Sequence, residues 1–237
     1  MRRVTLRYAT MHVDEGSQAS GEGERHRVRD IFTPPADDIG LRGKNEPLEL
    51  LKAWSGTSLA FAIYLMGGQV LNRAFWPVLL AAALTCGVGF VAHELAHRMV
   101  ARRFGATAHF VANDPWLLIS IALAFLRVFI AAPGAVWHQG YLTPRQSGLI
   151  ALAGPASNLA LAVLALLALW FIPPGMAVLG LSLELVLRIG YSINAWIGLF
   201  NMIPAGPFDG ARVLAWDWRV FGVTVAIGLL LTFVIRV

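Results

Sequence analysis

The sequence predicts an all-α membrane protein with about five to six transmembrane helices, and composition, apolar run length and charge placement each indicate this class. Of the 237 residues, 57% are hydrophobic and only 14% are charged, well outside the range of an ordinary soluble domain. Several apolar runs are long enough, at about 1.5 Å per residue, to cross the roughly 30 Å of hydrocarbon in a bilayer. Residues 1–52 hold nine of the 19 basic and nine of the 14 acidic side chains, so the remainder is strongly apolar.

This charge distribution divides the chain into a polar extension, residues 1–48, and a multi-pass membrane domain, residues 49–237. The extension mixes Gly, Ser, Glu, Arg and Asp without helical or strand periodicity, which predicts a disordered cytosolic segment. We assign it no chemistry. It contains no apolar core of the signal-peptide type, so we expect the first spanning helix to direct the chain to the membrane.

Five apolar segments are predicted to span the bilayer. Their approximate limits are residues 51–71, 75–100, 147–172, 176–203 and 221–235. A further apolar stretch, residues 116–132, is marginally short for a span, is interrupted by Arg127, and is closed by Pro133 and Gly134. Whether this stretch crosses the bilayer decides the topology of the chain.

Arginines at the end of the second predicted span orient the protein. Arg98, Arg102 and Arg103 follow that apolar run, and the positive-inside rule places their end of the helix in the cytoplasm, together with the N-terminus. The net charge of +5 comes from the membrane domain, where arginines at helix ends meet the anionic inner leaflet. No run of basic residues interleaved with aromatic residues occurs, which argues against a nucleic-acid partner.

The second predicted span carries a His-Glu-x-x-His motif near its cytoplasmic end. The i, i+4 spacing of His93 and His97 places both imidazoles on one helical face, about one turn apart, in position to bind one Zn²⁺. Glu94 then lies beside the metal as a potential general base. Ionisable residues in hydrocarbon are costly unless they are paired or bind metal, so this cluster needs a reason. The alternative is a polar patch at the membrane interface in which Glu94 pairs with Arg98.

A catalytic zinc site needs a third protein ligand and an open position for water. Asp209 is the strongest candidate, because it lies in residues 201–210, where two prolines and two glycines break an apolar helix. Backbone freed in this way is tolerated at membrane depth only in a buried or water-lined cavity. The alternative is an ordinary loop in which Asp209 caps the next helix.

The remaining acids of the membrane domain have simpler explanations. Glu184 precedes Arg188 by four residues, which predicts an ion pair within one helix. Asp114 precedes a proline in a turn-like setting, and Asp217 lies between two tryptophans near the interface. Two histidines of the connecting region are alternative metal ligands, although a lone histidine there is more often interfacial: His109 and His138.

Three motifs, taken in order, resemble those of the site-2 protease family of intramembrane metalloproteases, and of its compact archaeal and bacterial members in particular. The family's HExxH corresponds to residues 93–97, its GPxxN to residues 154–158 and its NxxPxxPxDG to residues 201–210. Together the three motifs are highly specific, and the likeness covers roughly residues 50–237. The sequence departs from the pattern at Ala211, where many members have a second glycine, and it has no PDZ-like insertion between the motifs.

The resemblance implies a three-helix catalytic core with one zinc ion per chain, held by His93, His97 and Asp209, and Glu94 as the general base. It implies Asn158 near the active site, where it would steady the substrate or the developing oxyanion. The implied activity is hydrolysis of transmembrane substrate helices within the bilayer, in regulated intramembrane proteolysis.

A parity argument bears on residues 115–140. If His97 and Asp209 bind one ion, the chain between them crosses the bilayer an even number of times, which two of the predicted spans satisfy. Residues 115–140 are then expected to be re-entrant or interfacial, with a β-hairpin around Pro133, in keeping with the strand-like element of the family. An exposed strand edge there would hold an unwound substrate by strand addition.

Two other functions compete with this one. A membrane metalloprotease of a different type would complete HExxH with a downstream glutamate, and only Glu184 is available for that role. A non-catalytic zinc-binding membrane protein or a transporter is the second alternative, although transporters usually show paired repeats with broken helices, and none is evident in the sequence.

Overall fold

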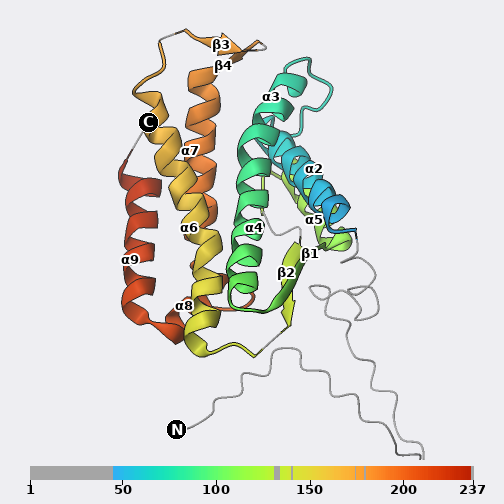
Figure 1. The fold of residues 1–237 in the computed structure, drawn as a ribbon. Coiled ribbons are helices and arrows are strands. Elements are labelled where there is room, and N and C mark those ends of the chain that lie inside the picture. Colours follow the sequence, from blue (N-terminus) through green and yellow to red (C-terminus); the bar gives the residue numbers. More distant parts are fainter. Residues whose placement is uncertain (1–44, 131–133, 140, 174, 179, 236–237) are drawn as a thin grey trace, which may run out of the picture. The chain divides into compact units, whose positions relative to one another are not determined.

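A computed structural model describes residues 45–130, 134–139, 141–173, 175–178 and 180–235, which are mostly helical (Figure 1). The α-helices are α2 (Glu46–Leu65), α3 (Phe75–Ala82), α4 (Val88–Arg103), α5 (Asp114–Phe125), α6 (Pro144–Leu169), α7 (Leu183–Phe200), α8 (Asp209–Trp216) and α9 (Trp218–Leu229). Two π-helical turns are η2 (Ala83–Gly87) and η3 (Leu230–Val234). The strands are β1 (Thr107–Ala112), β2 (Gly134–Gln139), β3 (Ala177–Val178) and β4 (Leu181–Ser182).

Three helices in the described part of the chain are long and apolar enough to cross a membrane. They are Phe75–Arg103, which joins α3, η2 and α4, together with α6 and α7. The shortest, α7, has 18 residues and is therefore about 27 Å long. These helices establish a membrane protein of the all-α class, as the composition predicts. The larger count of five to six spans stays a prediction.

Helix α2 begins and ends earlier than the predicted first span, which we placed at residues 51–71. It covers Glu46–Leu65, and its first two turns contain Glu46, Glu49 and Lys52. The side chains of these residues bind other parts of the protein, so only the later turns of the helix are uniformly apolar. Residues 1–44 lie outside the described chain, so the division of the chain at residue 48 stays a prediction.

The segment between β1 and β2 leaves one end of this sheet and returns to it. The two strands are antiparallel, and Ala112 is the register partner of Gly134. Helix α5, which lies between them in sequence, has 12 residues, too few to cross a bilayer. The short helix is compatible with the re-entrant or interfacial path expected for residues 115–140, which stays a prediction. The hairpin centred on Pro133 is wrong, because the strands are joined by α5 and the residues that follow it rather than by a tight turn.

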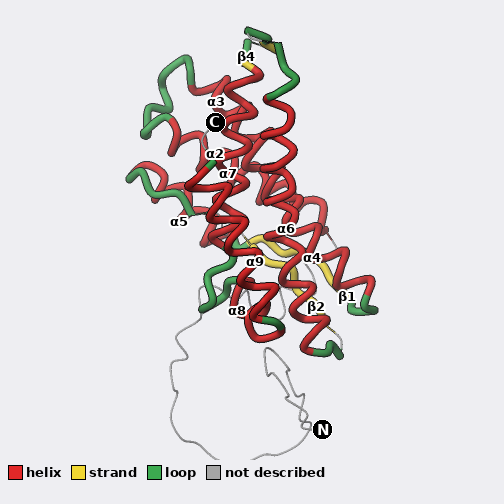
Figure 2. Tube along the Cα trace, turned by 90° about the vertical axis from the view of Figure 1, so that its left-hand side faces the viewer, coloured by secondary structure: helices red, strands yellow, loops and turns green. Residues whose placement is uncertain are grey.

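The remaining boundaries differ from the predicted ones at capping residues. Helix α6 begins at Pro144, where Thr143 and Gln146 form a reciprocal capping box. Helix α7 begins seven residues later than predicted, after the β3–β4 hairpin, whose Gly180 has a φ of 77°. The hydroxyl of Ser182 then accepts a hydrogen bond from the backbone N–H of Leu185. Figure 2 shows the two strand pairs at opposite ends of the helices.

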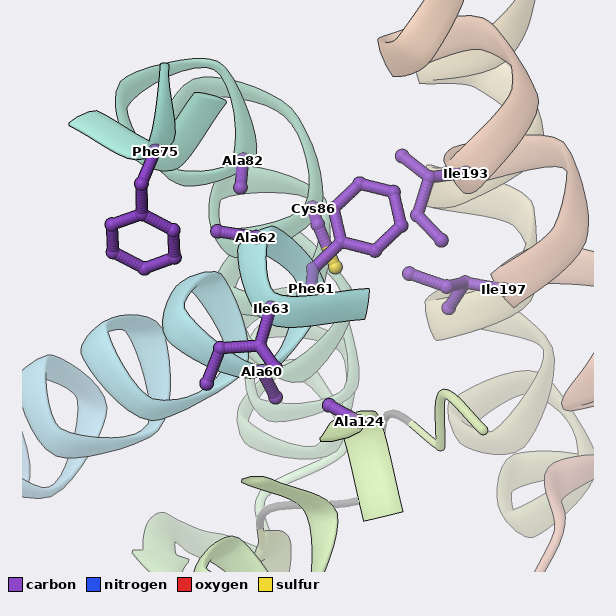
Figure 3. Packing of buried hydrophobic residues seen from close by; sticks show 10 residues of the cluster. All are labelled: Ala60, Phe61, Ala62, Ile63, Phe75, Ala82, Cys86, Ala124, Ile193 and Ile197. Atoms are coloured by element: carbon purple, nitrogen blue, oxygen red, sulfur yellow. The ribbon is translucent and has the colours of Figure 1, made fainter. Parts of the chain in front are cut away.

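The largest buried cluster joins α2 to the long helix and to α7. Phe61 of α2 lies among Cys86 of η2 and Ile193 and Ile197 of α7, and Ala124 of α5 closes the cluster from another side (Figure 3). On its other side, α7 packs against α6, with Leu159 of α6 and Tyr191 of α7 in a second cluster. Helices α4, α6 and α7 are thereby held together, and these are the helices that carry the candidate site.

The π-helical turn η2 lies one turn and a half before the HExxH motif. A π-helix contains one more residue per turn than an α-helix and frees a carbonyl group from the regular pattern. The carbonyl of Ala83 accepts a hydrogen bond of 3.1 Å from the indole Nε1 of Trp54. The added Cβ of any larger residue at Gly87 would overlap the side chains of Trp54 and Ser58. Helix α2 therefore packs closely against the irregular turn.

Candidate metal centre

Helix α4 brings the two histidines of the motif together, as the i, i+4 spacing predicts. The Nε2 atoms of His93 and His97 lie 2.9 Å apart, and the rings are perpendicular at 84°. Both side chains are buried. Helix α6 crosses α4 at this point, and Gly154 of α6 lies directly against both imidazoles.

Asp209 reaches the histidines from the irregular segment that follows α7. The N–H of Gly210 donates a hydrogen bond of 2.8 Å to the carbonyl of Asn201, which folds residues 201–210 back on the end of α7. A Cβ on Gly210 would overlap the backbone of Met202, so this fold of the segment requires glycine. Asp209 is the first residue of α8, and its carboxylate points to the histidines, so the alternative of a simple helix cap does not describe it.

The three side chains converge on one point. Oδ2 of Asp209 lies 3.3 Å from Nε2 of His93 and 3.1 Å from Nε2 of His97. One potential ligand atom from each residue falls within 4.8 Å of the other two, and all three residues are buried. Their role as metal ligands stays a prediction, but the structure brings together the residues that the sequence selects.

The hydrogen bonds behind the imidazoles make this cluster suitable for a metal ion. Nδ1 of His93 lies 2.7 Å from Oδ1 of Asn158, and Nδ1 of His97 lies 2.7 Å from the carbonyl of Ile150. Both partners are acceptors, so each Nδ1 carries the hydrogen and each neutral ring directs an Nε2 lone pair at Asp209. Three acceptors this close repel one another unless a cation or proton lies among them. The ligand atoms of a tetrahedral zinc lie about 3.3 Å apart, close to the separations seen here.

The second oxygen of the aspartate is held by an arginine. Oδ1 of Asp209 accepts a hydrogen bond of 2.7 Å from Arg212, one turn along α8. This bond leaves Oδ2 as the oxygen that faces the histidines. A charged donor bound to Oδ1 favours the ionised form of the carboxylate, which is the form that binds a metal.

Glu94 lies beside this cluster and is also buried. The backbone of Val136, in β2, lies near its carboxylate. Glu94 does not form the surface pair with Arg98 that we considered from the sequence, because Arg98 pairs with Glu46 at 2.7 Å. The carboxylate is thus available on the metal side of α4, where a general base would have to lie.

Asn158 is placed behind the metal cluster rather than in front of it. Its side chain has no exposed surface, and its Oδ1 faces His93. Its Nδ2 donates to the carbonyl of Gly89 at 3.0 Å and to Oδ1 of Asn194 at 2.8 Å. Both amide hydrogens are therefore used within the protein, which leaves none for the oxyanion that the family resemblance led us to expect there.

The other candidates considered from the sequence lie apart from the cluster. Glu184 pairs with Arg188 at 2.7 Å, as predicted. Asp217 caps α9 by accepting hydrogen bonds from two backbone N–H groups. Asp114 starts α5, instead of lying in a turn, and pairs with Lys52 at 2.9 Å. Among the described residues His109 is not part of the metal cluster, and the His138 side chain lies outside the described part.

Two acids on either side of the predicted boundary between the polar extension and the membrane domain cover the outer edge of β1. Glu46 accepts a hydrogen bond of 2.9 Å from the N–H of Phe110, and Glu49 accepts one of 3.0 Å from the N–H of Ala112. Arg102 of α4 donates to the carbonyl of Ala108 on the same edge. No local pattern in the sequence predicts that these side chains of α2 bind the backbone of β1, which lies more than 60 residues further along the chain. Asn194 was missed because its partner, Asn158, is 36 residues away on another helix. Arg212 lies three residues after Asp209 in α8, so its spacing was a signal that the sequence analysis did not use.

Comparison with known proteins gives the class of this site. Three relatives bear the name "Putative zinc metalloprotease", followed by MJ0611 in Methanocaldococcus jannaschii, Rip3 in Mycobacterium tuberculosis and YwhC in Bacillus subtilis. The chain is 39% identical to MJ0611 over 151 residues, which cover 61% of this chain and 76% of the relative. It is 32% identical to YwhC over 157 residues, covering 59% of this chain and 71% of the relative.

The match to Rip3 is 32% over 159 residues, covering 65% of this chain but only 35% of that longer relative. No family model matches the chain, and no solved structure matches it. The buried His-His-Asp cluster is of the kind that could hold the metal of a zinc metalloprotease, and two of its residues lie on a helix of membrane-spanning length. The chain belongs to the site-2 protease-like family of these enzymes.

Proposed function

We propose that the protein is an intramembrane zinc-dependent endopeptidase that hydrolyses peptide bonds of transmembrane substrate helices, in regulated intramembrane proteolysis. The observation that carries the proposal is the convergence of His93 and His97, on a helix long enough to span the bilayer, with Asp209 of α8. Glu94 lies on the same long helix as the histidines. Soluble metalloproteases hold such a site in a water-filled cleft, whereas here the polar cluster is enclosed by apolar helices.

The three converging side chains would hold one zinc ion. When bound, zinc polarises the scissile carbonyl and lowers the pKa of an attacking water. The carboxylate of Glu94 takes a proton from that water and returns it to the leaving amine. Arg212 holds the carboxylate of Asp209 in place.

Substrate presentation is the second requirement, because the backbone of a transmembrane helix is shielded by its own hydrogen bonds. The outer edge of β1 is already bonded to side chains of α2 and α4. Val136, in the other strand of the sheet, lies near Glu94. We therefore propose that an unwound substrate segment pairs with the β2 edge and so lies along the catalytic glutamate.

The decisive experiment compares the wild type with Glu94→Gln in cleavage of a transmembrane test substrate in lipid. The variant should keep stoichiometric zinc and lose cleavage, because Gln cannot accept the proton. Glu184→Gln is a matched control, since Glu184 forms only an exposed pair with Arg188 in the described chain. Undiminished cleavage by Glu94→Gln would contradict the assigned role.

The same preparation tests the non-catalytic alternative. One zinc per chain without turnover of any helix-breaking substrate would favour a zinc-binding membrane protein or a transporter. Physiological substrates would appear in membrane proteomics as single-span proteins that accumulate uncut in cells carrying Glu94→Gln.

We further propose that the N-terminus and the opening of the site face the cytoplasm. The proposal is supported by Arg98, Arg102 and Arg103 at the end of α4. Cysteines introduced singly near residue 103 and in the β3–β4 hairpin should differ in labelling by an impermeant reagent in intact cells, with only the hairpin labelled. Labelling of the residue-103 position alone would reverse the orientation.

A further inference from the structure

A chain of hydrogen bonds runs from the metal cluster into α7 through two buried asparagines. Oδ1 of Asn158 faces Nδ1 of His93 at 2.7 Å, and Nδ2 of Asn158 donates to Oδ1 of Asn194 at 2.8 Å. Nδ2 of Asn194 in turn donates to the carbonyl of Gly190 at 2.9 Å. Asn194 is 4% exposed, and it belongs to none of the three motifs found in the sequence.

The direction of these hydrogen bonds is fixed by two backbone carbonyls, which can only accept. The carbonyl of Gly89 accepts from Asn158, and that of Gly190 accepts from Asn194. If the amide of Asn158 were reversed, its oxygen would face two other acceptors and both bonds would be lost. Its NH₂ group would then face Nδ1 of His93, which favours the ring with hydrogen on Nε2, the form that cannot bind a metal through that atom.

We propose that Asn194 is a positioning residue of the metal site. It fixes the orientation of Asn158, and Asn158 holds His93 with its hydrogen on Nδ1 and its Nε2 lone pair directed at the metal position. The inference rests on the zinc ligation proposed above. Metal-binding histidines usually donate to a carboxylate, carbonyl or water, and loss of that partner weakens metal binding. Here a neutral amide takes the role, so the bilayer-embedded site carries no additional buried charge.

The packing around Asn194 supports this assignment independently of the hydrogen bonds. A Cβ added at Gly89 would overlap Oδ1 of Asn194, so the helix α4 leaves room for the amide at this position. Gly89 also supplies the carbonyl that accepts from Asn158. One glycine of α4 therefore contributes both the space and one of the two fixed acceptors.

The first test reads the histidine tautomer in the metal-free, full-length protein. With ¹⁵N-labelled histidine at alkaline pH, the signal assigned by comparison with His93→Gln should report hydrogen on Nδ1 in the wild type. Asn194→Leu, which removes the acceptor at similar volume, should shift this signal towards the Nε2–H form. Asn194→Asp keeps an oxygen facing Asn158 and should restore the wild-type signal. An unchanged tautomer in folded Asn194→Leu would overturn the proposal.

The second test measures zinc affinity by competition with a chelator. Asn194→Leu should bind zinc about 10- to 100-fold more weakly, the range found when a partner of a ligating histidine is removed, and Asn194→Asp should recover most of the loss. Tyr191→Phe is the matched control, because it removes buried hydrogen bonds of the same helix to Leu231 and Ile235 without touching the metal cluster. An equal loss of affinity in Tyr191→Phe would show general destabilisation and overturn the positioning role.

The two tests separate this inference from the proposed function. If the wild type shows the Nδ1–H tautomer but binds no zinc, the protease assignment is wrong. The effect of Asn194 on the orientation of Asn158 and His93 would still stand. If the wild type binds zinc and substitutions of Asn194 change neither the zinc affinity nor the tautomer of His93, only the positioning role of Asn194 is wrong. If Asn194→Leu does not fold, Gly89→Ala displaces Oδ1 of Asn194 from the other side and is read in the same way.

Discussion

Gly154 shows that the metal site depends on a residue that cannot bind metal. A Cβ at this position would overlap Nε2 of both His93 and His97. We expect Gly154→Ala to abolish stoichiometric zinc binding, because the methyl group would occupy the point on which the ligands converge. Metal analysis of the purified variant checks this. Gly222→Ala on α9 is the control, since a Cβ there meets nothing, and it should bind zinc as the wild type does.

Arg212 provides a second test at the level of a single side chain. It binds Oδ1 of Asp209, so its removal should let the carboxylate rotate and weaken zinc binding in Arg212→Gln, by about 10- to 100-fold. Arg212→Lys should lose less, because one charged donor is kept. Chelator competition gives the affinities, and Arg219→Gln, at an exposed arginine over the Trp218 ring, should have no effect. Equal affinities in Arg212→Gln and the wild type would exclude the role.

Single residues divide clearly into those the sequence predicts and those it does not. His93 and His97 follow from helical periodicity, and Asp209 from the broken helix around it, and the structure brings all three together. Asn194 is an isolated polar residue in an apolar helix, and its partner, Asn158, is 36 residues away. Only tertiary packing distinguishes it from an asparagine that binds its own helix.

The contact between α2 and β1 leads to a prediction about one element stabilising another. Glu49 is 4% exposed and accepts a hydrogen bond from the N–H of Ala112. In Glu49→Ala this buried N–H loses that acceptor, which costs about 1–3 kcal/mol, so amide exchange in β1 should be faster. Hydrogen exchange followed by mass spectrometry checks this. Glu184→Ala, which removes only an exposed pair, should leave exchange in β1 unchanged.

Element boundaries were predicted well where apolar length decides them and poorly where capping or tertiary pairing does. The parity argument predicts that residues 115–140 do not cross the bilayer, and α5, at 12 residues, is too short to do so. The position of β1 and β2 on either side of α5 was not predictable, because strand pairing over this distance leaves no local pattern. Helix α2 begins early because its charged first turns bind the sheet edge.

Two truncations test the division of the whole molecule. The described site draws on no residue before Glu46, so a chain lacking residues 1–44 should bind zinc and cleave substrate as the full chain does. A chain lacking residues 1–50 also loses Glu46 and Glu49 and should be less stable to thermal unfolding in detergent. Equal stability of the two truncated chains would show that the carboxylates on β1 contribute little.

The class of the whole molecule was accessible from composition, because lipid requires long apolar helices whatever the function. The number of spans was not, since α2 and the segment Trp218–Val234 lie at the margin of length and apolarity. Orientation and substrate depend on loop charges and on partners that the fold does not contain. They stay predictions for the labelling and cleavage experiments given above.

The irregular turn at Ala83–Gly87 lets one long helix turn different faces towards α2 and α6. Its extra residue advances everything beyond it by about 100° around the axis, relative to an unbroken α-helix. The half before the turn can therefore present its small residues to α2, while the half beyond it aims His93 and His97 at α6. Deleting a single residue from the turn would make it α-helical. The imidazoles would then be rotated about the helix axis, away from Asp209. The carbonyl of Ala83 accepts hydrogen bonds from both the N–H of Val88 and the indole of Trp54, so α2 is bonded directly to the irregular turn.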